Sequence, residues 1–360
     1  MTTFQPPTID QRIAATLRDD AGRIPVVVGL CGAGRTSLLH RLAQTIGPHD
    51  AQYVNVERTA TTPERFLAAL TASSPFVDAG QAPHVSSPRQ AFDAVLAYFT
   101  AAHRADERPV TFLLDEVLEF RTFESFPGLR RAMPELLAVM AASPNRFVLT
   151  SRYPTRTERA LAGASPQYVV VPMPALDPTD LALMLADEGV AGAAGNAASD
   201  IDGLARLVVA VSAGRPSYAR AIANALEASP SGAHGQDPMA ALATALGPGA
   251  DLWSLCAFDY EMRLHRARGY GALKAILEIL SEQEPLTLTD VSQRMGRTPG
   301  STKDYLSWLE DVDLVAVHRK RYRFRDPLLR LWVRLYCHST PPTAETIDRE
   351  VRQFAASCLG

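Results

Sequence analysis

The pattern of apolar and polar positions changes about halfway along the chain. In the first half, short apolar runs alternate with longer stretches whose apolar residues recur at helical spacing. The short runs predict strands at residues 25–29, 53–56, 110–114, 146–150 and 168–171. The stretches between them predict helices at residues 38–46, 63–70, 88–102 and 129–142. Strands that are apolar on both faces and separated by helices indicate a parallel sheet with helices on each side.

The middle of the chain has only helical patterns. After Pro172, apolar residues recur at helical spacing in segments 177–188, 201–212 and 216–226, which indicates a small all-helical module. The run SPSGAHGQDP at 229–238 is rich in glycine, proline and serine, and we interpret it as a linker. A further helix is predicted at 252–264.

The last part of the chain has the pattern of a winged helix-turn-helix domain. Helices are predicted at 272–282, 289–295 and 301–311, followed by a hairpin with strands at 314–318 and 322–325. A final amphipathic helix is predicted at 344–359. Its apolar face is formed by Ile347, Val351, Phe354 and Cys358, so we expect this helix to dock on the rest of the protein.

Composition excludes several classes of protein. A chain of 360 residues with 47% hydrophobic and 21% charged residues is long enough for more than one domain and is not a disordered chain. The net charge of -3 excludes a surface that is basic throughout, but not a local basic patch. No run approaches the roughly 20 apolar residues of a membrane span, and the first residues do not resemble a signal peptide. We therefore expect a soluble, cytoplasmic protein with reduced thiols and no membrane partner.

The sequence GLCGAGRTS at 29–37 is the first candidate site. It follows the frame Gly-x-x-x-x-Gly-Lys-Ser/Thr of a phosphate-binding loop, and it lies between a predicted strand and a predicted helix. In that setting, backbone N–H groups and the helix N-terminus point together at a phosphate. Gly29 and Gly34 would permit the backbone conformation and close approach that the loop needs. The nucleotide-binding candidates are Gly29, Gly32, Ala33, Gly34, Arg35, Thr36 and Ser37.

A pair of acids at the end of the strand at 110–114 supports this interpretation. The hydroxyl of Thr36 would ligate Mg²⁺, Asp115 would hold the ion through water, and Glu116 would polarise the attacking water. On the next predicted strand, Thr150 and Arg152 are candidates to contact the γ-phosphate. The alternative for Arg152 is an arginine that only caps a strand end at the surface.

Arg35 replaces the lysine of the frame. Arginine keeps the positive charge, but its planar fork is longer than the lysine ammonium and does not fit the same pocket. We therefore expect a site that binds ATP or ADP with Mg²⁺ and turns over slowly. Glu116, Arg35 and Arg152 are the candidates for a catalytic role.

These motifs resemble the STAND branch of the AAA+-like P-loop ATPases, in particular the archaeal-type ATPases that also occur in bacteria. GLCGAGRTS resembles their Walker A motif, FLLDE at 112–116 their Walker B motif, and TSR at 150–152 their sensor. AGRP at 213–216 resembles their Gly-x-Pro motif, and the resemblance implies that Gly214 and Pro216 lie near the adenine and couple the nucleotide to the lid. The family generally has lysine at the position of Arg35.

The expected fold class is α/β: a parallel P-loop sheet of the AAA+ kind with helices on both faces, then a helical lid and a winged helix. The expected parts are a nucleotide-binding domain at 1–173, a lid at 174–228, a linker with connecting helices at 229–268, a winged helix at 269–340 and a C-terminal helix at 341–360.

The predicted hairpin is the candidate DNA contact. Arg321, Arg323 and Arg325 alternate with Tyr322 and Phe324, so the arginines share one face. We interpret the following as phosphate or groove contacts: Arg319, Lys320, Arg321 and Arg323 on the hairpin, and Arg297, Ser301, Thr302 and Lys303 around the start of the third helix. The alternative is a protein-contact surface with a solvated charged face.

Three functions stay open at this point. The first is a switch in which ATP–Mg²⁺ sets the position of a winged helix on double-stranded DNA or a protein partner, with homo-oligomers that depend on nucleotide. The second is a motor-like ATPase with sustained turnover, which Arg35 disfavours. The third is a non-hydrolysing scaffold with a degenerate P-loop.

Overall fold

The chain folds into two compact units. The computed structural model describes residues 8–19, 22–76, 85–187, 198–228, 237–265, 269–338 and 340–359. The first unit comprises Met1–Leu30 and Gly34–Pro174, and the second comprises Cys31–Ala33 and Ala175–Gly360. Most of the predicted linker at 229–238 lies outside the described residues. None of the described helices is long and apolar enough to cross a membrane.

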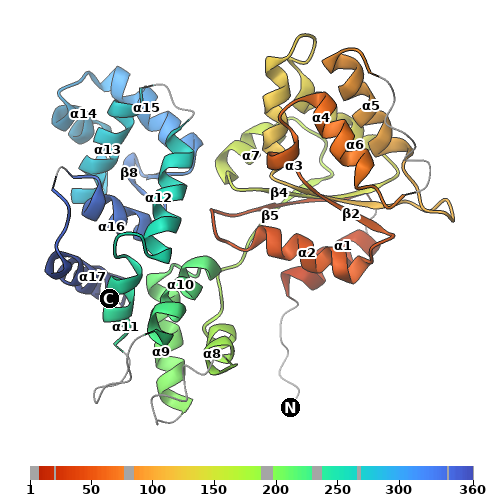
Figure 1. Ribbon diagram of the computed structural model, residues 1–360. Coiled ribbons are helices and arrows are strands. Elements are labelled where there is room, and N and C mark those ends of the chain that lie inside the picture. The colour runs from red at the N-terminus through yellow and green to blue at the C-terminus, as the bar shows by residue number, and fades with distance from the viewer. Residues whose placement is uncertain are drawn as a thin grey trace. The chain divides into compact units, whose positions relative to one another are not determined.

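The first unit is a parallel sheet with helices on both faces, as predicted (Figure 1). Its strands are β1 (Ile24–Val28), β2 (Ala51–Asn55), β3 (Thr111–Asp115), β4 (Arg146–Ser151) and β5 (Tyr168–Pro172). Its helices are α1 (Ile9–Asp19), α2 (Arg35–Ile46), α3 (Val56–Thr59), α4 (Pro63–Ala72), α5 (Pro88–Ala101), the 3-10 helix η1 (Val117–Ser125), α6 (Ala132–Ala142) and α7 (Pro154–Leu161). The strand order is β2-β3-β4-β1-β5, and every neighbouring pair is parallel.

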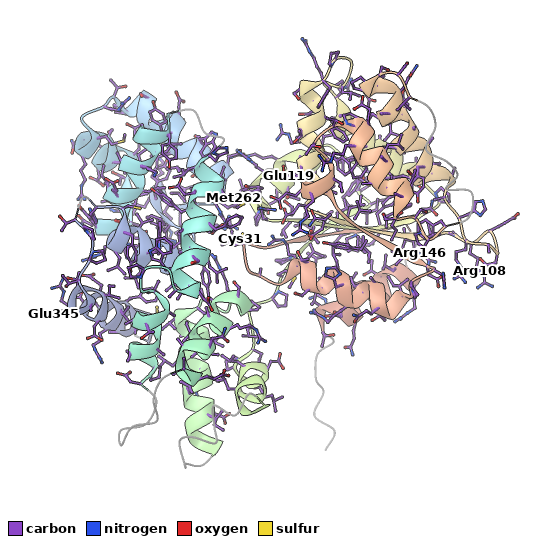
Figure 2. All side chains as sticks on the ribbon, viewed as in Figure 1. Cys31, Arg108, Glu119, Arg146, Met262 and Glu345 are labelled. Carbon is purple, nitrogen blue, oxygen red and sulfur yellow. The ribbon has the colours of Figure 1, made fainter. Side chains whose placement is uncertain are left out.

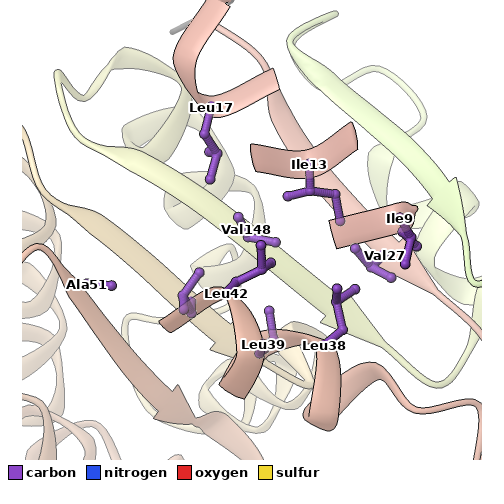
Figure 3. Close-up of a cluster of buried hydrophobic side chains, with 10 residues drawn as sticks. Ile9, Ile13, Leu17, Val27, Leu38, Leu39, Leu42, Ala51 and Val148 are labelled. Atoms are coloured by element: carbon purple, nitrogen blue, oxygen red, sulfur yellow. The ribbon is translucent and has the colours of Figure 1, made fainter. Parts of the chain in front are cut away.

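The two faces of this sheet are packed by different side chains. Helices α1 and α2 cover one face with aliphatic residues, among them Ile13 and Leu39, which pack on Val27 of β1 and Val148 of β4 (Figure 3). On the other face, Phe112 of β3 and its neighbours form a cluster of aromatic rings beneath α4, α5 and η1. Successive strand residues therefore serve opposite faces, and both faces are dry.

The direction of the strands fixes where chemistry can occur. Figure 2 shows Arg146, the first residue of β4, and Glu119, which follows β3, at opposite ends of the sheet. The carboxyl ends of β1, β2, β3 and β4 meet on the side of the sheet where Glu119 lies. In open parallel sheets this is the edge at which ligands bind.

The second unit is helical apart from a small antiparallel sheet. Its helices are α8 (Pro178–Asp187), α9 (Ala198–Val211), α10 (Pro216–Glu227), α11 (Pro238–Ala245), α12 (Asp251–Leu264), α13 (Tyr270–Glu282), α14 (Leu288–Met295), α15 (Pro299–Asp311), α16 (Pro327–Tyr336) and α17 (Ala344–Leu359). Its strands are β6 (Leu286–Thr287), β7 (Val315–His318) and β8 (Arg321–Phe324), in the order β6-β8-β7. Three helices followed by this hairpin confirm the predicted winged helix.

The terminal helix docks as predicted. On α17, Ile347 and Val351 are buried where the helix packs on α11, α9 and α16. The predicted contact residues Phe354 and Cys358 are only half-buried, while Ala355 is buried in their place.

Candidate functional site

The loop after β1 leads directly into α2. Gly32 and Gly34 have positive φ angles of 78° and 88°, so these two positions require glycine. Gly29 was expected to share this requirement, but it is not among the described residues with positive φ; its N–H instead donates to the carbonyl of Ser151 at 3.3 Å. Thr36 and Ser37 are exposed in the first turn of α2.

Arg35 turns back into the loop. Its guanidinium donates from Nη1 to the carbonyl oxygens of Gly29 and Leu30, the latter at 2.6 Å, and from Nη2 to Oε1 of Glu116 at 2.7 Å. The side chain is only 7% exposed, and its Nε is buried without a hydrogen-bond partner. The positive charge at the lysine position is therefore present, but it is paired with the Walker B glutamate.

Asp115 is the acceptor at the centre of a hydroxyl cluster. Its carboxylate, which is 1% exposed, accepts hydrogen bonds from Thr36 at 2.7 Å, from Tyr53 at 3.0 Å and from Thr150 at 2.5 Å. Hydroxyl and carboxylate oxygens are the hard donors that Mg²⁺ prefers. The contact between Thr36 and Asp115 thus places together the two side chains expected to hold the metal, and their chemistry fits that ion.

Tyr53 was not among the residues singled out from the sequence. It lies on β2, in register with Leu113 of β3, and its hydroxyl reaches Asp115. Burial and the neighbouring Asp115 carboxylate raise the pKa of Tyr53 to about 12, so the phenol stays a protonated donor at neutral pH. The available signal was its position near the end of the strand beside the acidic one.

Glu116 stands between two arginines. Its Oε1 accepts from Arg35, and its Oε2 accepts from the Arg152 backbone N–H at 3.0 Å and pairs with Arg152 Nε at 3.1 Å. Arg152 in turn donates through Nη2 to Glu57 at the start of α3. Arg35, Glu116, Arg152 and Glu57 thus form a chain of alternating charge, here called the charge ladder, along the carboxyl edge of the sheet.

The charge ladder keeps Glu116 ionised. Burial by itself would raise the pKa of this carboxyl group, but the positive charges of Arg35 and Arg152 outweigh burial and lower it. Both carboxylate oxygens are bonded to arginine. While these bonds persist, Glu116 cannot accept a proton from a water molecule.

The remaining residues of this edge are buried as well. Thr150 is fully buried and joins the two acids, because its hydroxyl donates to Asp115 and accepts from the Glu116 N–H at 3.0 Å. Arg152 is only 5% exposed and ion-paired, so the alternative of a surface arginine capping the strand is wrong. Its predicted contact with the γ-phosphate stays a prediction.

The Gly-x-Pro turn lies in the second unit. Gly214 has a φ of 66°, and a Cβ at this position would approach the Cβ of Ala175 to 2.5 Å, so the turn requires glycine. Pro216 is the first residue of α10. The Gly214 carbonyl accepts a hydrogen bond from the Leu176 N–H at 2.8 Å, which attaches the turn to the segment before α8.

The hairpin β7–β8 presents the predicted basic face. Arg321 is paired with His318, and Arg323 with Ala316, so both arginines lie on the same face. Tyr322 is half-buried and Phe324 is buried on the other face. The five candidate contact residues are all exposed: Lys303, Arg319, Lys320, Arg321 and Arg323.

One residue expected at the nucleic-acid surface is not there. Thr302 is fully buried, and its hydroxyl donates to the carbonyl of Thr298 at 3.0 Å. The side chain lies on the inner face of α15, where it satisfies the helix backbone instead of facing solvent.

Comparison with known proteins was made at the level of sequence and of structure. Neither a family model nor a curated protein matches the sequence. Among solved structures, a Walker-type ATPase from Pyrococcus abyssi superposes with a TM-score of 0.67 over 90% of this chain and 94% of that chain, at 14% identity. This chain has the fold of a Walker-type P-loop ATPase with a C-terminal winged helix.

Two further solved structures are less similar to this chain. RuvB, the Holliday junction branch migration motor of Thermotoga maritima, has a TM-score of 0.38 at 12% identity, covering 87% of each chain. Orc1 of Aeropyrum pernix in complex with DNA has a TM-score of 0.40 at 15% identity, covering 97% of this chain and 91% of that chain.

The charge ladder predicts how stability responds to acid. A lowered pKa means that Glu116 stabilises the fold above its unfolded pKa of about 4.3, and that this contribution is lost as the pH falls through the lower folded pKa. Glu116→Gln leaves buried Arg35 without a counter-charge and leaves Arg152 with Glu57 alone, so it should cost about 3–5 kcal/mol at neutral pH.

Thermal unfolding of wild type and Glu116→Gln, followed by circular dichroism from neutral to acidic pH, measures the difference. We expect the gap in melting temperature to be constant above about pH 5 and to narrow below about pH 4. A variant as stable as wild type at neutral pH would contradict the ladder.

Proposed function

We propose that this protein is a nucleotide-dependent switch: ATP with Mg²⁺, bound at the loop after β1, sets the position of a winged helix on duplex DNA. The observation that carries the proposal is the pairing of Arg35 with Glu116, since it leaves the binding groups of a P-loop in place and engages its catalytic base. Such a site is suited to binding that persists and poorly suited to rapid turnover.

The binding half of the site would use backbone and hydroxyl groups. The N–H groups around Gly32 and Gly34 and the N-terminus of α2 would receive the phosphates. Thr36 and Asp115 would hold Mg²⁺, which neutralises phosphate charge when bound. A phosphate in the loop would attract the Arg35 guanidinium away from the carbonyls of Gly29 and Leu30.

The catalytic half of the site is restrained. A general base contributes about 10²- to 10⁴-fold to a rate, and Glu116 can act as one only after it leaves Arg35 and Arg152. Slow turnover follows, which favours a switch over a motor with sustained hydrolysis. A scaffold that binds no nucleotide is the second candidate.

The winged helix favours nucleic acid as the partner because of its turn. Arg319 and Lys320 form a two-residue turn in which both φ angles are positive, at 49° and 64°. This conformation costs about 1–2 kcal/mol for each L-residue, and two-residue turns of this kind usually have the sequence Asn-Gly. Two long cations kept in a strained turn indicate that their charge at the tip is needed.

The charge distribution points to the β7–β8 hairpin, here called the wing, as the principal contact. Helix α15 exposes Lys303 beside Asp304, so its outer face has little net charge. The wing exposes Arg319, Lys320, Arg321 and Arg323. Long cations at a hairpin tip reach phosphates without reading base edges, so binding should depend little on DNA sequence.

The first test is binding of nucleotide. ATP with Mg²⁺ should raise the melting temperature of protein shown to be free of bound nucleotide, because a ligand that binds only the folded state stabilises it. Thr36→Val, which removes the hydroxyl beside Asp115, should reduce the shift obtained with Mg²⁺. No shift for wild type at millimolar ATP would contradict the proposed function.

The second test is turnover. Arg35→Lys should speed hydrolysis, on the order of a hundredfold, because the shorter cation releases Glu116 and restores transition-state contacts. Glu116→Gln should abolish the remaining activity. A wild type that already turns over near about one per second, and is slowed by Arg35→Lys, would show that the arginine is adapted to catalysis.

The third test concerns the wing. Changing Arg319→Asn together with Lys320→Gly gives the turn its preferred residues and removes two cations, so the fold should be as stable as wild type or more stable. Affinity for labelled duplex, measured by fluorescence anisotropy, should fall on any sequence. The slope of log affinity against log salt should flatten by about two units.

A matched control separates lost contacts from lost charge. Arg12→Gln with Arg65→Gln removes the same charge from exposed positions of the first unit and should leave duplex binding unchanged. If wild type binds no duplex at low salt, with or without ATP, the wing is a protein-contact surface and the scaffold is favoured.

A further inference from the structure

Two buried ion pairs lie at the root of the wing. Arg215 pairs with Asp326 at 2.8 Å, and Arg263 pairs with Asp259 at 2.8 Å. All four side chains are at least nine-tenths buried. All belong to the second unit, and they are here called the wing-root clamp.

The first pair joins the Gly-x-Pro turn to the winged helix. Arg215 is the residue between Gly214 and Pro216, and its guanidinium lies over the ring of Tyr218 at 4.8 Å. The Tyr218 hydroxyl accepts from Arg215 at 3.1 Å and donates to Asp326 Oδ2 at 2.9 Å. The other oxygen of Asp326 accepts from the Leu328 N–H at 3.0 Å and caps α16. The residues that immediately precede α10 and α16 are thus bonded to one another.

The second pair is bonded to the segment that enters the hairpin, just before β7. Arg263 of α12 donates from Nη1 to the carbonyls of Val312 at 3.0 Å and Asp313 at 2.8 Å, just before β7. The Asp313 carboxylate pairs with Arg325 at 2.6 Å, just after β8. Both ends of the wing are therefore fixed to the helices α10 and α12 that precede the winged helix.

Stability alone does not account for the wing-root clamp. Desolvating a buried ion pair costs about as much as the pair returns, and an apolar pair of similar volume often serves the fold equally well. Buried charges add specificity: each charged side chain must keep its partner, so the elements that carry the two partners are held in one relative orientation. The wing-root clamp makes the orientation of the wing relative to the Gly-x-Pro turn a fixed property of the second unit.

We propose that Arg215, through Asp326, is a positioning residue that makes the wing follow the Gly-x-Pro turn, so that nucleotide state is transmitted to DNA affinity. The inference rests on the proposed function, since it concerns the coupling between the two ligands. Arg215 itself need touch neither ligand.

The decisive variant is Arg215→Met with Asp326→Asn. Both charges are removed together, and methionine fills the volume of the arginine stem. Asparagine keeps an acceptor oxygen for the cap of α16, and its amide NH2 can donate to the Tyr218 hydroxyl, which no longer accepts from Arg215. We compare the affinity for labelled duplex without nucleotide and with ATP–Mg²⁺, and the affinity for nucleotide with and without duplex.

In wild type, each ligand should change the affinity of the other by the same factor, about fivefold or more. In the double variant this factor should fall to about one, while the affinity for each ligand alone stays close to wild type. A matched control, Arg334→Met with Glu350→Gln, removes the ion pair that joins α16 to α17 and should keep the wild-type factor.

The two ways of failing are distinguishable. A double variant that keeps the wild-type factor overturns the role of Arg215 and leaves the switch intact. A wild type whose factor is one overturns the switch and this coupling role together. Amide hydrogen exchange of β7 and β8 shows whether the attachment is rigid: faster exchange in the double variant than in the control supports the wing-root clamp, and equal exchange counts against it.

Discussion

The buried contact between Arg35 and Glu116 is the constraint on which the carboxyl edge of the sheet depends. A carboxylate removed from water needs a counter-charge, and Glu116 has two, so its ionised state and its orientation are fixed by Arg35 on one side and Arg152 on the other. Arg152 then requires Glu57, and the chain ends where that glutamate reaches solvent. The edge therefore behaves as one electrostatic unit.

That unit divides the site into a part that binds and a part that is restrained. The hydroxyl cluster around Asp115 meets the charge ladder at Thr150, whose hydroxyl contacts both acids. In the proposed function, metal and phosphate bind beside Asp115, whose hydrogen bonds to Thr36 and Tyr53 are not part of the ladder. Release of Glu116 requires its bonds to both arginines to change, which is a larger rearrangement.

Much of the fold could be predicted from the sequence, because short apolar runs such as 110–114, set between helical patterns, are typical of buried strands. The partners of long charged side chains could not be predicted. Arg35 and Glu116 are 81 positions apart, and the direction of the guanidinium depends on carbonyls of the loop as well as on that acid. The P-loop frame showed that Arg35 keeps the positive charge of the lysine, but it did not show which groups the guanidinium contacts.

Other features that the sequence did not predict depend on backbone angles or on the register of the strands. The P-loop frame names glycine positions without giving their backbone angles, so Gly29 was given a requirement that belongs to Gly32. Tyr53 became visible only when the register of β2 on β3 placed it beside Asp115. Helix α1 was not predicted, although the spacing of Ile9, Ile13 and Leu17 indicates a helix with one apolar face. All three residues pack on the sheet.

Backbone strain recurs near the charged groups of both units. Among the described residues, the non-glycine positions with positive φ are Glu107, Glu116, Ala213, Asp313, Arg319 and Lys320. Apart from Glu107, these lie in the charge ladder, beside the Gly-x-Pro turn, at the wing root and at the wing tip. Each such conformation costs on the order of 1–2 kcal/mol and persists only where the surroundings determine it. In each unit the strained positions therefore coincide with parts of the proposed switch: the charge ladder in the first unit, and the Gly-x-Pro turn, the wing root and the wing tip in the second.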